Sequence, residues 1–178
     1  MLETEFWHLI AESRAALREA HVDIQEQSEV LKSKLISLGP QPIIEFKVVF
    51  ENKFVNANSW ELCAVQFLAF GIFTDTSFNA FRAWLIAQGE EVYVRGVKEP
   101  STLADLLKEE DSLSLLDSAE YFLYCADLAY EELIGRDIWD DVPEDLPKDT
   151  MESDQTFDET NICQVYPHLC KLFGYTPS

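Results

Sequence analysis

The stretch FTDTSFNAFRAWLIAQG, residues 73–89, contains three polar groups from which a small site could be built: the carboxylate of Asp75, the guanidinium of Arg82 and the amide of Gln88. A carboxylate can transfer a proton, and a guanidinium can bind an anion through its planar fork. In a helix, Asp75 and Arg82 would share a similar azimuth but lie roughly 10 Å apart along the axis. This separation is too large for a direct bond and favours separate roles for the two charges.

Each charge also has a structural role. Asp75, together with Thr74 or Thr76, can accept hydrogen bonds from the free backbone N–H groups at the start of the helix. Arg82 stands among apolar residues, so we expect a partly buried guanidinium that needs a carboxylate or carbonyl partner. The stretch therefore predicts a helix cap and a structural ion pair. A pocket formed by Asp75, Arg82 and Gln88 is the alternative.

A second set of candidate residues surrounds Trp139 in the acidic sequence RDIWDDVPEDLP. Residues 131–160 contain twelve acidic and two basic residues, so they hold half of the net charge of −20. Carboxylates around an exposed aromatic side chain can steer a basic partner while the ring fills a pocket on it. The alternative is a solvated acidic linker whose Trp139 folds back onto the core. The predicted partner-binding residues are Trp139, Asp137, Asp140, Asp141, Glu144 and Asp145.

The overall charge limits the classes of partner. The 178 residues include 33 acidic and 13 basic ones, and so negative a protein repels nucleic-acid backbones and anionic membrane surfaces. We expect a basic protein partner, with no direct nucleic-acid or membrane binding. The N-terminus lacks the pattern of a secretory leader, and the longest strongly apolar segment, residues 62–73, is shorter than the roughly 20 residues that span a bilayer. Both features favour a cytoplasmic protein.

Motifs for catalysis are scarce. The sequence contains no G-x-S-x-G, P-loop, dinucleotide-binding glycine pattern or H-E-x-x-H. Four cysteines stand far apart among apolar residues, which favours buried thiols over disulfides or a metal site; they are Cys63, Cys125, Cys163 and Cys170. We therefore predict no catalytic residue, no metal and no cofactor, although a site assembled only in the folded chain stays open.

Helical periodicity dominates and predicts an all-α fold, a compact multi-helix domain with a central buried helix and an acidic C-terminal loop. Residues 3–20 form one predicted amphipathic helix. A second opens at Asp23, ends before Gly39, and pairs with the first as an antiparallel hairpin. Residues 42–54 fit a strand or a helix; we predict a helix because a single strand would lack a partner.

The rest of the chain follows the same reasoning. Asn58 is the predicted cap of a helix over NSWELCAVQFLAFG, and a late helix runs from a capping pair, Asp117 and Glu120, to Gly135. Residues 136–160 are predicted to form an acidic, partly mobile loop. Within 161–178, a short helix from Pro167 to Phe173 is predicted to dock on the core, and the whole of 1–178 forms a single predicted domain.

Three segments resemble a bacterial family known only as domain of unknown function 4240: FWHLIAESR at 6–14, FGIFTDTSFNAFRAWLIAQGEEVY at 70–93 and EPSTLADL at 99–106. The resemblance implies an all-helical fold and no established activity. In that family a Gly-Gly-Cys-Ser-Asp-Asp type turn typically precedes the central helix. This chain keeps one glycine and the first carboxylate, Asp75, but has Thr76 in place of the second, which weakens a paired-carboxylate site.

Together these observations predict an acidic interaction protein that binds a basic protein partner. An immunity protein that neutralises a cationic toxin, or an inhibitor, is its most concrete form. The competing prediction is a helical ligand-binding domain or enzyme with a pocket at the start of the Phe78 helix.

Overall fold

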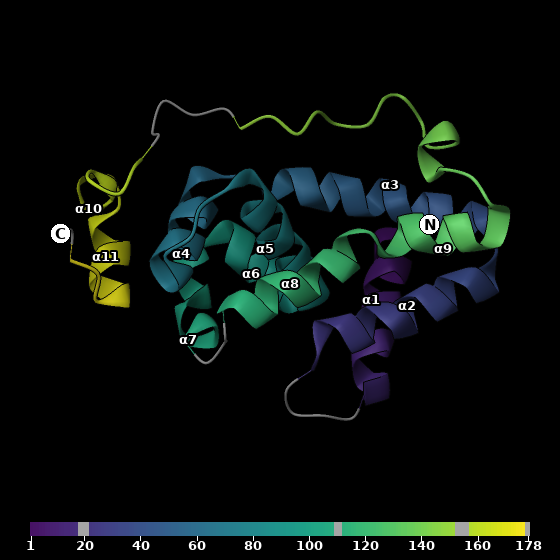
Figure 1. Ribbon diagram of the computed structural model, residues 1–178, viewed down its shortest axis with the longest axis horizontal. Coiled ribbons are helices and arrows are strands. Elements are labelled where there is room, and N and C mark those ends of the chain that lie inside the picture. The colour runs from purple at the N-terminus through teal and green to yellow at the C-terminus, as the bar shows by residue number, and fades with distance from the viewer. Residues whose placement is uncertain (18–21, 109–111, 152–156, 177–178) are drawn as a thin grey trace.

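The computed structural model describes residues 1–17, 22–108, 112–151 and 157–176, and every regular element in these ranges is a helix (Figure 1). The predicted all-α fold is confirmed. None of the described helices is long and apolar enough to cross a membrane.

The first two helices pack against each other. They are α1 (Glu3–Leu17) and α2 (Ile24–Leu38). The Asp23 carboxylate caps α2 by accepting hydrogen bonds from two backbone N–H groups of its first turn, as the sequence predicts. The predicted last residues of the first helix, 18–20, lie outside the described residues.

α3 (Pro40–Asn56) settles the choice between strand and helix for residues 42–54. Gly39 has φ 93°, which glycine adopts without strain, and turns the chain from α2 into α3. Prolines in the first turn are tolerated because the first N–H groups of a helix have no partner within it. The buried side of α3 repeats every three or four residues and consists of Ile43, Phe46, Lys47, Phe50 and Phe54.

α4 (Trp60–Phe70) and α5 (Asp75–Ala87) follow. The predicted cap of α4 is wrong by one residue: the Ser59 hydroxyl accepts the capping hydrogen bond from the backbone N–H three residues later. The Asn58 side chain is instead turned toward Asp149, to which its Nδ2 donates at 2.7 Å, and its Oδ1 accepts no hydrogen bond from the described residues. Ten of the thirteen residues of α5 are buried, so the helix is packed on nearly all sides.

Three short helices then lead away from α5: α6 (Glu90–Lys98), η1 (Pro100–Leu103) and α7 (Ala104–Leu107). Gly96 in α6 lies against η1 and α5, since a Cβ atom there would be 2.9 Å from Leu103 Cδ2 and 3.1 Å from Leu85 Cδ1. Any larger residue would force the Leu103 side chain to shift, so glycine favours this close packing.

The late helix predicted to end at Gly135 is two helices, α8 (Ser112–Leu123) and α9 (Cys125–Ile134). Tyr124 leaves the helical conformation between them, at φ −101° and ψ 9°. This break allows α8 to pack on α5 and α2 while α9 packs on α2 and α3. Asp117 lies inside α8, so the predicted Asp117 capping pair was wrong. Gly135, at φ 78°, ends α9 as predicted.

The C-terminal part contains η2 (Ile138–Asp140), α10 (Ile162–Val165) and α11 (Pro167–Phe173). Residues 143–151 form no helix and lead from η2 at one end of the molecule toward α10 and α11 at the other (Figure 1). The predicted bounds of the last helix are correct, and it packs on α4. Residues 152–156 of the predicted mobile loop lie outside the described residues.

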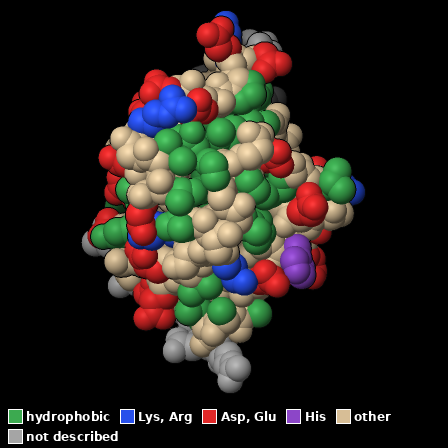
Figure 2. All heavy atoms as spheres, turned by 90° about the vertical axis from the view of Figure 1, so that its right-hand side faces the viewer, with side chains coloured by type: hydrophobic (Ala, Val, Ile, Leu, Met, Phe, Trp, Pro, Cys, Tyr) green, Lys and Arg blue, Asp and Glu red, His purple; other side chains and the backbone are tan. Residues whose placement is uncertain are grey.

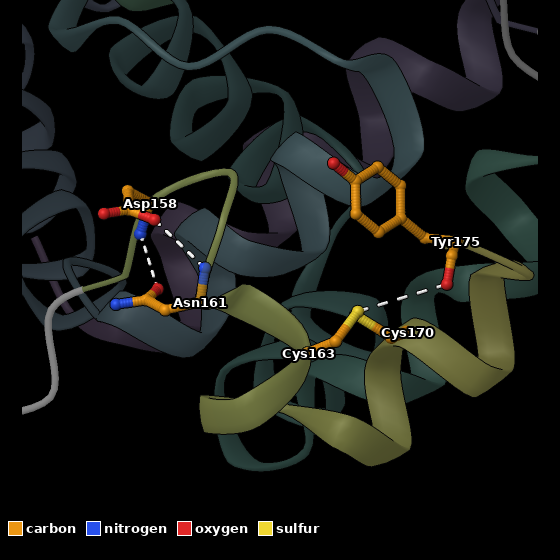
Figure 3. The surroundings of a disulfide bond; sticks show 5 residues. All are labelled: Asp158, Asn161, Cys163, Cys170 and Tyr175. Atoms are coloured by element: carbon orange, nitrogen blue, oxygen red, sulfur yellow. Dashed lines mark hydrogen bonds between the residues drawn. A yellow bond between two sulfur atoms is a disulfide. The ribbon is translucent and has the colours of Figure 1, made fainter. Parts of the chain in front are cut away.

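The cysteines form two different groups. Cys163 and Cys170 form a disulfide that joins α10 to α11 (Figure 3), so the prediction of thiols was wrong for these two. The reason is the bend between the short helices, which brings the two Cα atoms to 5.6 Å of each other. Cys63 and Cys125 are free and buried, as predicted.

Candidate functional site

Trp139 lies in η2, and 50% of its surface is exposed. Two contacts hold it in place. The Asp137 carboxylate accepts a hydrogen bond from the Trp139 backbone N–H at 3.0 Å, and Lys47 Nζ lies 4.7 Å from the centroid of its ring, a distance at which a cation attracts the π-face of an indole. Trp139 is therefore neither loose nor folded into the core. The Lys47 ammonium group lies against the ring, and half of the Trp139 surface stays exposed to solvent.

Lys47 was not singled out by sequence reasoning. Its residue exposure is only 3%, and Nζ lies 2.8 Å from Asp127 Oδ2 and 2.9 Å from Glu51 Oε1. The pair with Asp127 joins α3 to α9, the pair with Glu51 lies within α3, and together they compensate a buried charge that would otherwise be costly. The available signal was a lysine directly after Phe46, on the apolar stripe of α3.

The carboxylates predicted around Trp139 divide into two groups. Asp141 is engaged internally: it accepts a hydrogen bond from the Tyr130 hydroxyl and pairs with Arg136 Nη2 at 2.7 Å. The hydrogen bond to the Asp141 carboxylate raises the pKa of the Tyr130 phenol. The other four carboxylates are exposed on η2 and the segment after it; they are Asp137, Asp140, Glu144 and Asp145.

Exposed hydrophobic side chains gather at the same end of the molecule. α2 and α9 run in the same direction, since Ser28 contacts Cys125 and Lys32 pairs with Glu132, so the two helices end together. Figure 2 views this end and shows hydrophobic side chains with many acidic and a few basic ones around them. The large hydrophobic residues exposed at the helix ends are Leu38, Leu133 and Ile134. This patch and Trp139 present apolar surface inside a negative rim.

The start of α5 is closed by a capping box. The Thr74 hydroxyl accepts from the Ser77 backbone N–H, and Ser77 Oγ accepts from the Thr74 backbone N–H. Asp75 follows the cap as the first residue of α5 and is exposed, where its charge complements the helix dipole. Gln88 is at the opposite end of α5. The three residues of the alternative pocket therefore do not meet.

A pocket does lie at the start of α5, with a volume of about 270 Å³. It opens between α5 and α8 and is lined by hydroxyl, amide and carboxylate groups together with apolar side chains. Its polar lining residues include Thr76, Asn79, Asp117, Glu120 and Tyr124. None of Asp75, Arg82 and Gln88 lines it.

Arg82 is almost fully buried, with 2% of its surface exposed. Its Nη1 and Nη2 atoms donate to the two carboxylate oxygens of Asp149 at 2.8 and 2.9 Å. Nη1 also donates to the Phe54 carbonyl at 3.1 Å and Nη2 to Asn79 Oδ1 at 2.6 Å. The guanidinium carbon lies 3.7 Å from the Phe54 ring centroid and 5.0 Å from that of Phe78. The structural ion pair expected from sequence is present.

Asp149 is the partner that sequence reasoning did not find. It stands 67 residues after Arg82, and no pattern in the acidic segment distinguishes it from its neighbours. Hydrogen bonds from Arg82 lower the pKa of the Asp149 carboxyl, against the opposing effect of partial burial. The contact with Arg82 therefore favours the ionised form of Asp149.

Groups for nucleophilic or metal chemistry are not brought together in the described part of the chain. Burial raises the pKa of the Cys63 thiol to about 12, so it is not a ready nucleophile. His8 and His168 are exposed and each faces a single glutamate. Among the described residues, no group of three or more histidines, cysteines and carboxylates is placed to hold a metal ion.

Comparison with known proteins adds a family. The family model described as protein of unknown function (DUF4240) matches residues 1–132. The chain belongs to this family. No curated protein and no solved structure matches the chain significantly. The matched region of this DUF4240 protein includes Lys47 and Arg82 but ends before Trp139 and Asp149.

Proposed function

We propose that this DUF4240 protein is an acidic interaction protein that binds a basic protein partner through the Trp139 surface, defined as Trp139 with Asp137, Asp140, Glu144 and Asp145. The observation that carries the proposal is the indole of Trp139, which is half exposed and lies against the ammonium group of the buried Lys47. An aromatic anchor that is ordered before binding loses little conformational entropy on contact with a partner.

Charge supports the same partner class. The net charge of −20 and the four exposed carboxylates beside the ring attract a basic surface and raise its rate of association. The apolar patch at the ends of α2 and α9 extends the contact area. An immunity protein for a cationic toxin, or an inhibitor of a basic protein in the cytoplasm, is the concrete form of this function.

Capture experiments with matched variants test the proposal. The Trp139→Ala variant removes the anchor. A triple variant, Asp140→Asn, Glu144→Gln and Asp145→Asn, removes three charges beside it. The control triple variant removes three exposed charges from α6 and its end, through Glu90→Gln, Glu91→Gln and Glu99→Gln. Both triple variants have the same net charge, so only the position of the lost charges differs.

We expect the wild type and the control to capture the same basic protein. Trp139→Ala should weaken its binding by about thirty-fold or more, as loss of a central aromatic anchor does. The triple variant at the Trp139 surface should flatten the salt dependence measured by calorimetry, because fewer charges are screened. Failure to capture any basic protein, or equal binding by Trp139→Ala, would refute the proposal.

The pocket between α5 and α8 favours a second candidate, a helical ligand-binding domain. Its volume of about 270 Å³ is close to the lower limit for small-molecule sites, and carboxylates at Asp117 and Glu120 favour a ligand with a cationic group. A fragment screen by ligand-observed NMR, repeated with Glu120→Gln, tests it. This candidate is lost if no fragment binds in a way that depends on Glu120.

A further inference from the structure

The contact between Arg82 and Asp149 has the geometry of a recognition site for a carboxylate. Two parallel N–H···O bonds, of 2.8 and 2.9 Å, join the guanidinium fork to both oxygens of one carboxylate. This bidentate arrangement is how arginine recognises carboxylates and phosphates, and here the group that it binds is a carboxylate. Asn58 adds a third donor, at 2.7 Å from Asp149 Oδ1.

The receptor side of this contact is built entirely within the matched family region. The Phe54 carbonyl and Asn79 hold the guanidinium in its plane, and the rings of Phe54 and Phe78 pack against it. Asp149 alone comes from beyond residue 132. The carboxylate is 39% exposed while Arg82 is 2% exposed, so Asp149 lies between the cation and solvent.

Asp149 does not satisfy the site completely. Arg82 Nε and Asn58 Oδ1 are buried and have no hydrogen-bond partner among the residues that the structure describes. A buried donor or acceptor without a partner costs free energy. Arg82 is 2% exposed, and its Nε donor has no partner among the described residues. The binding site around Arg82 is therefore only partly satisfied by the Asp149 carboxylate.

The segment that carries Asp149 is otherwise weakly attached. Residues 143–151 contain no helix, and most of them are exposed; Leu146 and Met151 are partly buried. Hydrogen bonds between this segment and other described residues are made by Asp149. Local opening of such a segment is cheap compared with opening of the helical core.

We propose that Arg82, Asn58 and Asn79 form a binding site for a small-molecule carboxylate, which the protein keeps occupied with its own Asp149. An external carboxylate binds when residues 143–151 lift. The tether gives Asp149 an effective concentration of about 10 mM or more, at least as high as the dissociation constant of the carboxylate group itself, so Asp149 occupies the site when no competitor is present. A simple carboxylate therefore competes only at tens of millimolar or above, and a natural ligand that also uses Arg82 Nε binds more tightly. This inference does not depend on Trp139 or on a basic partner.

Acetate, which reproduces the Asp149 side-chain group, is the probe. In Asp149→Ala the site is empty of its internal carboxylate, so 100 mM acetate should raise the melting temperature by about 3 to 5 °C relative to 100 mM chloride, for a dissociation constant on the order of 10 mM. Asp145→Ala, an exposed position on the same segment, is the matched control; it keeps Asp149, which competes with acetate, so its melting temperature should rise by less than that of Asp149→Ala.

Hydrogen exchange of the wild type distinguishes a carboxylate-binding site at Arg82 from a purely structural ion pair with Asp149. Displacement of Asp149 by 100 mM acetate should accelerate hydrogen exchange in peptides that cover residues 143–151 by about twofold or more, with no change in α3 and no effect of chloride. Rescue of Asp149→Ala without faster exchange in the wild type would identify a tether only and overturn the proposal. Absence of rescue by acetate in Asp149→Ala would overturn it as well.

Discussion

Lys47→Met gives the sharpest test of how the Trp139 surface is supported. Methionine keeps most of the apolar contact of the lysine stem but removes the ammonium group. Asp127 and Glu51, whose side chains are 21% and 17% exposed, would then lack their cation. Removal of one partner of a buried ion pair costs about 3 to 5 kcal/mol. We take the lower end, about 3 kcal/mol, because both carboxylates keep some contact with water.

The free energy of unfolding should be measured by urea titration followed by circular dichroism. For a chain of this size, about 3 kcal/mol corresponds to a fall in melting temperature of about 6 to 12 °C. The slope of the free energy of unfolding against urea concentration should be unchanged, since the variant exposes the same surface on unfolding. Trp139→Ala should lower the free energy of unfolding by less in the Lys47→Met background than in the wild type, because the contact between the ammonium group and the ring is already lost.

Lys34→Met is the matched control. Lys34 pairs with Glu12 at 3.0 Å, but both side chains are substantially exposed. Exposed pairs contribute little because water and salt screen them, so the control should lose only a small fraction of the stability lost by Lys47→Met. Equal losses in the two variants would refute the assignment of Lys47 as a buried support of η2.

Three further predictions follow from burial and charge. A thiol reagent should find no fast-reacting group in the native protein, because burial raises the pKa of Cys63 to about 12; it should find two groups after denaturation and four after reduction of the Cys163–Cys170 disulfide. Gly96→Ala should destabilise by about 1 kcal/mol in urea titrations, since a Cβ 2.9 Å from the buried Leu103 outweighs the gain in helix propensity. The stability advantage of the wild type over Asp149→Asn should be complete at pH 7 and shrink below about pH 4, since the folded protein has the lower pKa for this carboxyl.

Much of the helical architecture could be predicted because local patterns determine it. The repeat of apolar residues in α3, the glycine at position 39 and the proline at 167 each act within one or two turns of the chain. The errors arose where tertiary contacts decide. Tyr124 breaks a continuous apolar stripe because α8 and α9 must cover different helices, and nothing in the local sequence marks that break.

The candidate sites show the same division. A buried Arg82 that needs a carboxylate follows from its apolar neighbours, but the choice of Asp149 depends on the path of residues 143–151 across the molecule. The charge around Trp139 is obvious from composition, whereas Lys47 beneath the ring is not. Sequence reasoning finds which group needs a partner, and the fold determines which partner it receives.

Trp139 and the segment that follows it are held in place by different residues. One variant can therefore separate the proposed binding of a basic partner from the proposed carboxylate site. Lys47 and Asp137 hold the indole before the chain reaches Pro143, while Asp149 fastens the segment that carries Glu144 and Asp145. Asp149→Ala should therefore leave the anchor in place and loosen only the carboxylates beyond it. Affinity for a basic partner should then fall little, because exposed charges mainly affect the association rate. A large loss of affinity would instead mean that Arg82 and its internal carboxylate form part of the partner-binding surface.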